Sequence, residues 1–509
     1  METIISKVKV VEDAARIIQE LKKEQKKVVQ CHGVFDLLHP GHLRHLASAK
    51  REGDVLVVTL TADKFVRRGP GRPIFNEILR AEALASLEAV DYVCIDHNFT
   101  AVEIIKQLRP SIYVKGQEYA NKQNDVTGKI SDEEEAVAAV GGKVVFTNDI
   151  TFSSTKLINE FLDILPETTK KYLKELSQKY PVDYINQQFQ DMKKLKVLVI
   201  GDAIVDEYHY CESMGKSLKE HLVVSKFLSA ESFAGGVFAT ANNTAQVCGE
   251  VELVTILGKK DSQENFIRSH MAENVKCSFF YHPDVPTTIK RRYINSILNQ
   301  KLFEICFMDD RPIPHDLESQ IVQYLKEKMS HYDMVIVSDF GHGLLTPSLI
   351  KLICTQAKFL ALNVQTNSAN TGFNLVIKYP KADYITVDEP EIRLAAHDKH
   401  GELKTVMSSI VEKLNCQQLM VTRGHQGSIY YQTKSGFHET PSLSSKVVDR
   451  IGAGDAFFAY TAPCAFSGLP NDLLSCIGNA VGALKVQIVC NRTPVDKLDL
   501  MKFLVRLLK

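Results

Sequence analysis

The ten residues from Gly33 to His42, Gly-Val-Phe-Asp-Leu-Leu-His-Pro-Gly-His, constrain the fold of this chain more than any other stretch. They follow an apolar run, Val28–Cys31, that is typical of a buried strand, and they precede Leu43–Lys50, which has a helical pattern. A strand, a glycine-bearing turn and a helix start together form an anion site, because free backbone N–H groups and the helix dipole face the same point. His39 and His42 add two donors at that turn, so the stretch predicts phosphate binding.

Two other interpretations of His39 and His42 are a zinc pair and two surface histidines. The spacing of three residues would allow both rings to reach one metal ion. No third ligand lies nearby in the sequence, however, and zinc usually needs three or four. A nucleotide phosphate site is therefore the preferred interpretation.

The composition excludes several classes of protein. The chain has 509 residues, 45% of them hydrophobic and 24% charged, with 61 basic and 61 acidic side chains. A formal net charge of zero argues against a broad nucleic-acid or membrane surface. The 11 cysteines include no Cys-x-x-Cys pair, and no apolar run reaches membrane length. We expect a cytoplasmic protein with reduced cysteines that binds neither nucleic acid nor membrane.

The chain is too long for one core, and its pattern predicts two α/β domains, each a parallel or mostly parallel sheet flanked by helices. We expect a first domain over residues 1–165, a solvated helical linker over 166–192 and a second domain over 193–509, opened by the apolar run Val197–Asp202. The strands expected in the first domain are Val28–Cys31, Val55–Leu60, Tyr92–Ile95, Ile112–Val114 and Val144–Phe146. The helices expected between them are Asn76–Ala89, Ala101–Leu108 and Glu133–Val140.

The first domain resembles the nucleotidyltransferase family marked by a His-x-Gly-His motif, which includes cytidylyltransferases and adenylyltransferases and has a Rossmann-like fold. More narrowly, it resembles the adenylyltransferase part of the bacterial bifunctional heptose enzymes that make ADP-heptose. The matching positions are Gly33–His42, Asp63-Lys64, Gly71-Arg72-Pro73, Arg80, Leu87–Asp91, Val114-Lys115-Gly116 and Phe152–Thr155.

The resemblance implies transfer of a nucleotidyl group to a sugar 1-phosphate with release of pyrophosphate. It implies that His39, His42 and Lys64 are catalytic, with Arg67 and Arg68 as less certain helpers or simply solvated side chains. The nucleotide-binding residues that it implies are Gly33, Phe35, Asp36, Gly41, Arg72, Lys115, Ser153, Ser154 and Thr155. The Ser-Ser-Thr run also fits a simple helix cap. Mg²⁺ would bridge the phosphates, and ATP is favoured as the nucleotide, with CTP as the alternative.

A second signature, Val448–Phe457, contains Gly-Ala-Gly-Asp and resembles the anion hole of ribokinase-like (PfkB) sugar kinases. Gly452, Ala453 and Gly454 would let backbone N–H groups surround a phosphoryl group, and Asp455 would accept a proton from the attacking hydroxyl. Further matches follow in the family's order: Gly201-Asp202, Asp206, Ala234-Gly235-Gly236, Ser338–Gly343, Asp388–Glu391 and Val421–Gly427. The closest likeness is to the kinase part of the same heptose enzymes, although the two domains come in reversed order.

This second resemblance also assigns roles to individual positions. It implies that Thr422, Gly424 and Gly427 join the anion hole in binding ATP. It places the sugar on Asp202, Asp206, Gly235, Gly236 and Arg292, and a metal ion near Asp388 and Glu391.

Several positions depart from the heptose-kinase pattern. Ala239 replaces an Asn, Asn363-Val364-Gln365 replaces Asp-Pro-Lys, His342 replaces a Lys, and Glu304 falls where an Arg is expected. Asp449-Arg450-Ile451 stands for Asp-Thr-Thr. Lys290, Arg291 and Arg292 could still supply one phosphate clamp. We expect the acceptor to differ from heptose 7-phosphate, either in stereochemistry or in lacking the distal phosphate.

The leading hypothesis is a bifunctional enzyme, a nucleotidyltransferase and carbohydrate kinase, that makes a nucleotide-activated sugar. Its partners would be a nucleoside triphosphate and a sugar or sugar phosphate, and a homodimer is an open alternative. One rival keeps only the transferase active, with the kinase fold serving to bind ligand or to dimerise. A second rival is a nucleotide or sugar-phosphate sensor without turnover.

Overall fold

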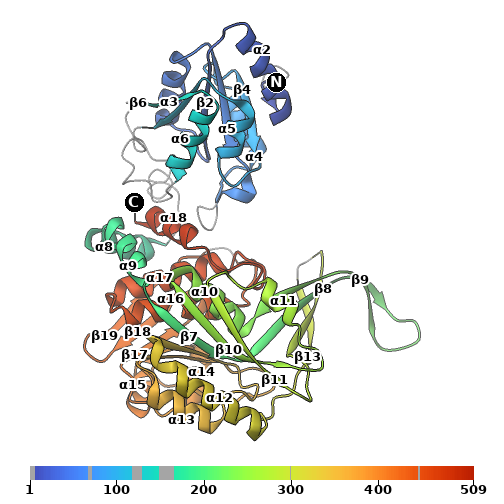
Figure 1. The fold of residues 1–509 in the computed structure, drawn as a ribbon, viewed down its shortest axis with the longest axis vertical. Helices are drawn as coiled ribbons and strands as arrows, with labels where there is room; N and C mark the ends of the chain where they lie inside the picture. Colours follow the sequence, from blue (N-terminus) through green and yellow to red (C-terminus); the bar gives the residue numbers. More distant parts are fainter. Residues whose placement is uncertain are drawn as a thin grey trace. The chain divides into compact units, whose positions relative to one another are not determined.

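The computed structural model describes residues 6–66, 72–116, 129–147, 166–297, 300–444 and 447–508. The chain divides into two compact units (Figure 1). Unit 1 comprises Met1–Pro166 and Met501–Lys509, and unit 2 comprises Glu167–Leu500. Among the described helices, none combines the length and the apolar character needed to cross a membrane.

Unit 1 is built on a parallel sheet in the order β1-β4-β3-β2-β5-β6. Its strands are β1 Val8–Lys9, β2 Val28–Gly33, β3 Val55–Thr61, β4 Tyr92–Asp96, β5 Ile112–Gly116 and β6 Lys143–Thr147. The chain moves outward from β2 to β3 and β4, and then returns to place β5 on the other side of β2. The carboxyl ends of β2 and β5 therefore form the switch point at which such sheets bind ligands.

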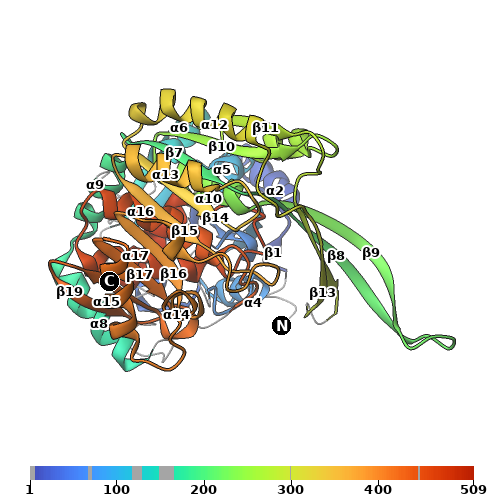
Figure 2. The same ribbon diagram turned by 90° about the horizontal axis from the view of Figure 1, so that it is seen from below.

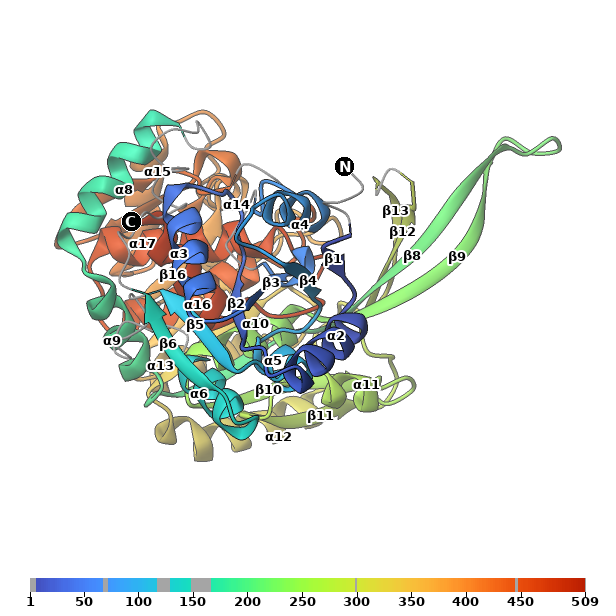
Figure 3. The ribbon, with the colours of Figure 1, turned by 90° about the horizontal axis from the view of Figure 1, so that it is seen from above.

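Helices cover both faces of this sheet, and Figure 3 shows the two layers. On one face lie α3 (Pro40–Arg51) and α4 (Glu77–Ala85), whose apolar side chains join a core with β2 and β3. On the other lie α2 (Val11–Lys23), α5 (Val102–Leu108) and α6 (Lys129–Ala139). Strands buried from both sides must be apolar throughout, which explains the continuous runs in the sequence. Helix α2 was not predicted.

Unit 2 contains a larger sheet in the order β11-β10-β7-β14-β15-β16-β17-β18-β19, parallel except for its last two pairings. Its strands are β7 Lys196–Gly201, β10 Glu250–Gly258, β11 Val275–His282, β14 Met334–Asp339, β15 Leu360–Val364, β16 Tyr384–Asp388, β17 Gln418–Thr422, β18 Ser428–Gln432 and β19 Gly436–Thr440. One face carries α10 Gly236–Val247, α16 Ala453–Phe466 and α17 Asn471–Lys485. The main core on the other face includes α12 His315–Lys328, α13 Pro347–Gln356, α14 Glu389–Ala396 and α15 Leu403–Lys413.

A second, four-stranded sheet in unit 2 has the order β13-β12-β8-β9 and was not predicted. It consists of β8 Ala203–Lys216, β9 Val223–Gly235, β12 Ile289–Asn295 and β13 Gln300–Phe307. The long β8–β9 hairpin projects from the rest of unit 2 (Figures 1 and 2). We call these four strands the small sheet.

The segment between the two sheet regions forms α8 (Glu167–Lys179) and α9 (Val182–Met192). Both helices bury apolar side chains, among them Leu176 and Phe189. Tyr172 in α8 donates to the backbone oxygen of Asp472 at 3.0 Å, and Tyr180, just after α8, donates to the Asp472 carboxylate at 2.7 Å. These two helices are therefore part of unit 2 and pack against the rest of it, whereas the charged sequence of the segment suggests a solvated connector.

Candidate active sites

The histidine turn of unit 1 lies between β2 and α3, at the switch point of the sheet. His39 caps α3 in an extended conformation, and its Nδ1 accepts a hydrogen bond of 3.1 Å from the Gly41 amide. This bond assigns the proton of the neutral ring to Nε2, which has no hydrogen-bond partner among the described residues. His39 is only 6% exposed, and this burial lowers its pKa. The neutral His39 ring can therefore donate a hydrogen bond from Nε2 to an anion.

The rest of the turn is packed around the second histidine. The rings of His39 and His42 stack with centroids 4.0 Å apart, and Phe35 meets His42 edge-on at 5.3 Å. Phe35 has a φ of +49°, in the left-handed region. A Cβ at Gly33 would approach the Phe35 ring to 3.1 Å, so any larger residue there would require that ring to move by a few tenths of an ångström.

Asp36 and Arg72, both predicted to bind nucleotide, form a buried ion pair in which Arg72 Nη1 lies 2.6 Å from Asp36 Oδ2. The other oxygen of Asp36 accepts from the Ile74 amide at 2.6 Å. The carboxylate therefore holds residues 72–74 against the histidine turn. A nucleotide-binding role for Asp36 and Arg72 stays a prediction.

Arg80 on α4 positions this site, although sequence reasoning gave it no role beyond motif membership. Its buried guanidinium donates to the backbone oxygens of Val34 at 2.5 Å and Thr61 at 2.9 Å, and to the Asp63 carboxylate at 2.6 Å. It thereby links the histidine turn to the short helix Asp63–Phe65, which carries the exposed Lys64. The sequence signal for this positioning role is an arginine on a helical face that is otherwise apolar.

Lys115, at the end of β5, forms a largely buried ion pair with Glu133 on α6, at 2.7 Å. This ion pair does not show whether Lys115 contacts the nucleotide, and that contact stays a prediction. The predicted phosphate-binding residues Ser153, Ser154 and Thr155, together with Arg67, Arg68 and Gly71, lie outside the described residues.

In unit 2, the Gly-Ala-Gly-Asp motif forms the N-terminus of α16. Gly452 has a φ of +76°, and a Cβ there would lie 2.1 Å from Asn491 Oδ1, so only glycine fits. A Cβ on Gly454 would meet no described atom within 4 Å, which leaves open space above the first turn. Backbone N–H groups at a helix start that faces open space suit a phosphoryl group.

Asp455 lies in this first turn and is only 6% exposed. Its Oδ1 accepts a 2.5 Å hydrogen bond from Gln365 Nε2, which also contacts Asn363 Oδ1 at 2.9 Å. Burial raises the pKa of Asp455 to about 6, against the Gln365 hydrogen bond and the positive charges of Lys485 and Lys290, which lower it. A carboxylate with such a pKa is a suitable general base near neutral pH.

A buried lysine, missed by sequence reasoning, contacts the backbone next to the predicted anion hole. Lys485 at the end of α17 is fully buried, and its Nζ donates to the backbone oxygens of Ile451, at 3.0 Å, and Cys490. Burial lowers its pKa. Asp449 accepts from Tyr208 and Lys301, each at 2.6 Å. Burial by itself would raise the pKa of Asp449, but the hydrogen bonds that it accepts hold its pKa below the usual value.

A cavity of about 300 Å³ lies beside the anion hole. It brings the loops around β17 and β18 next to the start of α16. Its lining includes Thr422, Gly424, Gly427, Ala453 and Gly454, five of the positions predicted to bind ATP.

The predicted sugar-binding residues of unit 2 gather at the carboxyl end of β7 and on the small sheet. Arg292 Nη1 contacts Asp206 Oδ1 at 2.5 Å, and a Cβ on Gly235 would lie 2.0 Å from Asp206 Oδ2. Asp202 accepts from the amides of Phe340 at 2.8 Å and His342 at 3.3 Å. Burial and the neighbouring Asp339 raise the pKa of Asp202 to about 6.

Comparison with family models decides where unit 2 belongs. The model of the pfkB family carbohydrate kinases matches residues 194–497. The chain belongs to this family. Phosphofructokinase-2 from Escherichia coli, solved with substrates and products, matches with a TM-score of 0.51 and 13% identity, covering 62% of this chain and all of that one. At that identity the likeness shows the fold of the kinase unit alone.

Unit 1 matches a second family model, described as cytidylyltransferase-like, over residues 31–160. Two bacterial proteins named bifunctional protein HldE are similar to part of this chain. The one from Gluconobacter oxydans is 42% identical over 147 residues, 28% of this chain and 29% of that protein. The one from Geobacter metallireducens is 39% identical over 163 residues, 31% of each. The chain thus spans about three tenths of the length of these relatives, and the expected pair of α/β folds is confirmed.

The predicted metal ligands of the kinase, Asp388 and Glu391, form a reciprocal capping box at the start of α14. Glu391 also accepts from the Thr366 amide at 2.9 Å. Burial and the adjacent Asp388 raise the pKa of Glu391 to about 7. In the part of the chain that the structure describes, no group of three or more His, Cys, Asp and Glu side chains could hold a metal. The two carboxylates fit a Mg²⁺ that takes most of its ligands from phosphates and water.

Proposed function

We propose that this chain is a bifunctional enzyme that makes a nucleotide-activated sugar. The kinase unit phosphorylates a sugar with ATP, and unit 1 couples a sugar 1-phosphate to a nucleoside triphosphate. The observation that carries the kinase half is the buried Asp455 beneath an open helix N-terminus, next to the nucleotide cavity. The neutral His39 donor at the switch point of unit 1 supports the transferase half.

In the kinase reaction, Asp455 removes the proton of a sugar hydroxyl as its oxygen attacks the γ-phosphorus of ATP. The bond from that phosphorus to the β–γ bridging oxygen breaks, and ADP leaves. Backbone N–H groups of Gly452–Gly454 face the charge that develops on the phosphoryl oxygens. Asp388 and Glu391 would hold Mg²⁺, which offsets the phosphate charge when bound.

In the transferase reaction, an oxygen of the sugar 1-phosphate attacks the α-phosphorus, and pyrophosphate leaves. The acceptor oxygen is already ionised, so the reaction needs positioning and electrostatic stabilisation and no general base. The Nε2–H of His39 would donate to a non-bridging phosphate oxygen, and His42, whose ring stacks on that of His39, would contact the α-phosphate. We propose ATP as the nucleotide and CTP as the alternative.

One observation favours a second role for the kinase unit. The outer face of the small sheet exposes Phe227, Phe303, Ile305 and Phe307, and the Tyr293 ring stacks on Phe303 at 4.6 Å. A patch of this kind usually binds another surface, and a second copy of the chain would make the unit a dimerisation module. The proposed reactions occur in the cytoplasm, in keeping with eleven free cysteines.

Two assays on the full chain test the proposal. Pyrophosphate release is measured with each nucleoside triphosphate against a panel of sugar 1-phosphates, and ADP release is measured with ATP against a panel of sugars and sugar phosphates. We expect both activities, with His39→Ala losing only the first and Asp455→Asn only the second. Pyrophosphate release without any ADP release would favour the binding or dimerisation role, and the absence of both would contradict the proposal.

A further inference from the structure

Several cationic side chains lie near the predicted sugar-binding residues, on the side of the kinase that would hold the phosphate acceptor. The carboxylates that pair with these cations limit whether they can bind a phosphate. Along β12, Lys290 and Arg292 lie on the same face of the small sheet as Asp206 on β8, because side chains alternate between faces. Arg291 lies on the opposite face. A phosphate on the acceptor would need cations from the first of these faces.

Arg292 is already bound by two carboxylates. Its Nη1 lies 2.5 Å from Asp206 Oδ1, and its Nε lies 2.7 Å from Glu304 Oε2. Burial by itself would lower the pKa of Arg292, but the two carboxylates raise it above its ordinary value. The guanidinium is thus charged and already held by two carboxylates. Glu304 also adds a negative charge on this face, which repels a phosphate.

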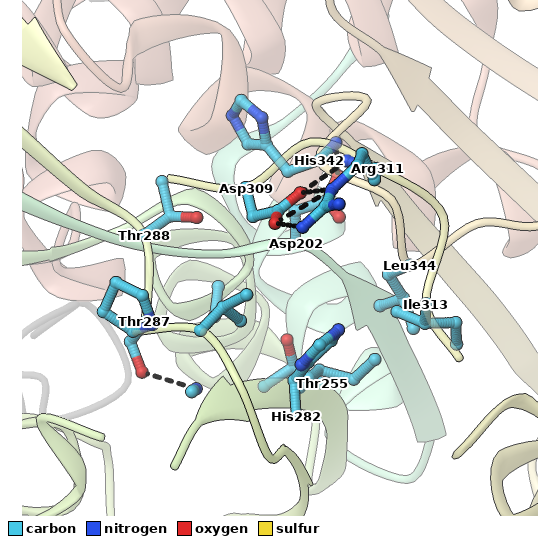
Figure 4. Close-up of a pocket in the computed structure, with 15 residues that line it drawn as sticks. Asp202, Thr255, His282, Thr287, Thr288, Asp309, Arg311, Ile313, His342 and Leu344 are labelled. Carbon is cyan, nitrogen blue, oxygen red and sulfur yellow. Dashed lines mark hydrogen bonds and ion pairs between the residues drawn. The ribbon is translucent and has the colours of Figure 1, made fainter. Parts of the chain in front are cut away.

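The other cations near this side are paired in the same way. Arg291 Nε lies 2.6 Å from Glu207 on the far face, and Lys378 Nζ lies 2.6 Å from Asp339. Arg311 pairs with Asp309 at 2.5 Å (Figure 4). A phosphate that recruited any of them would first have to break a formed ion pair.

His342 lines a cavity on this side of the kinase, and its ring is uncharged. The residue is only 9% exposed, and neither ring nitrogen has a hydrogen-bond partner among the described residues. Burial and the charge of Lys290 lower its pKa to about 3. It lines a cavity of about 50 Å³ with Asp202, Thr287 and Thr288, which has room for a few water-sized groups (Figure 4). A neutral imidazole ring can donate a hydrogen bond to one hydroxyl group and accept one from another.

Lys290 is the remaining cation on this face, and within the described chain it has no carboxylate partner. Its charge lowers the pKa of both Asp455 and His342, so it acts on the reacting carboxylate and on the cavity beside His342. Among the described residues of this face, this one lysine would have to serve both the phosphoryl group that is transferred and any phosphate on the acceptor.

We infer that the kinase acceptor is an uncharged sugar and not a sugar phosphate, with Asp206 and the neutral His342 binding its hydroxyls. This inference rests on the proposed kinase function. Carboxylates and a neutral imidazole are good partners for hydroxyl groups, whereas a dianionic phosphate needs charged donors.

The test compares ADP release by the full chain with free heptoses, hexoses and pentoses and with the terminal phosphate of each. We expect kcat/KM for the best free sugar to exceed that for its phosphate at least 100-fold. A preference for any sugar phosphate over its free sugar would overturn the inference and leave the kinase function standing. Turnover of no sugar in either form would overturn the kinase function, and the inference with it.

A pair of matched variants isolates the ion pair that carries the argument. Glu304→Gln removes one carboxylate from Arg292, and we expect the ratio of kcat/KM for free sugar to that for sugar phosphate to fall about tenfold. Glu207→Gln removes the partner of Arg291 on the opposite face and should leave that ratio unchanged. Equal ratios in both variants would show that Glu304 does not exclude phosphate, which contradicts the inference.

Discussion

Replacing the buried Asp455 by Asn should abolish phosphoryl transfer and at the same time stabilise the kinase unit. Asn keeps an oxygen that can accept from Gln365 Nε2, but it cannot accept a proton. Loss of a general base typically costs 10²- to 10⁴-fold in rate. In the unmutated enzyme, kcat/KM should fall below pH about 6 as Asp455 becomes protonated.

The expected stabilisation follows from the pKa of Asp455. Burial raises this pKa from 3.8 to about 6, and one pKa unit is worth about 1.4 kcal/mol, so holding the ionised form costs about 3 kcal/mol at pH 7. Because the folded pKa lies above the unfolded one, stability is lost as pH rises from about 4 to about 6 and stays lost above. Asn removes that penalty, so Asp455→Asn should raise the melting temperature of the kinase unit at pH 7 by about 4 °C.

The assay is thermal unfolding of both proteins from pH 4 to pH 8, beside ADP release with the best sugar. The difference in stability between Asp455→Asn and the unmutated protein should be near zero at pH 4 and grow until about pH 6. Asp472→Asn is the control of opposite sign, because hydrogen bonds from Tyr180 and Lys179 outweigh burial and lower the pKa of Asp472. A stability gain that is absent or independent of pH would refute the reasoning about burial, and retained turnover would show that another group is the base.

Three further substitutions test the geometry of the two units. His39→Ala should reduce pyrophosphate release about 10²- to 10³-fold without changing ADP release, and equal loss of both activities would contradict separate sites. Arg80→Leu leaves the Asp63 carboxylate and three carbonyl oxygens without their donor, and should lower the stability of unit 1 by about 3–5 kcal/mol, measured by denaturant unfolding. Gly235→Ala places a Cβ 2.0 Å from an Asp206 oxygen and should raise KM for the sugar more than KM for ATP; equal effects on both would argue against Asp206 as a sugar ligand.

Contiguous motifs carried the sequence prediction of both sites. The turn from Gly33 to His42 and the helix start at Gly452–Asp455 each depend on neighbours along the chain, so local backbone chemistry was enough to predict the turn and the helix start, while their roles as binding sites stay predictions. The apolar runs of unit 1 were also predicted as strands, because a sheet covered on both faces requires continuous burial. The small sheet escaped prediction, since its strands mix exposed apolar and charged residues without a clear alternation.

What the sequence by itself determined is the chemistry available at each candidate site: two histidines at a turn predicted to bind phosphate, and an aspartate at a predicted anion hole. What only the tertiary structure decided is which charges remain free to act. Arg292 pairs with Asp206, which lies 86 positions earlier in the chain, and Gln365 donates a hydrogen bond to Asp455, which lies 90 positions later. An ion pair neutralises a side chain that the sequence shows only as a cation. The partners meet because the strand order brings distant segments together, and no local pattern encodes that order.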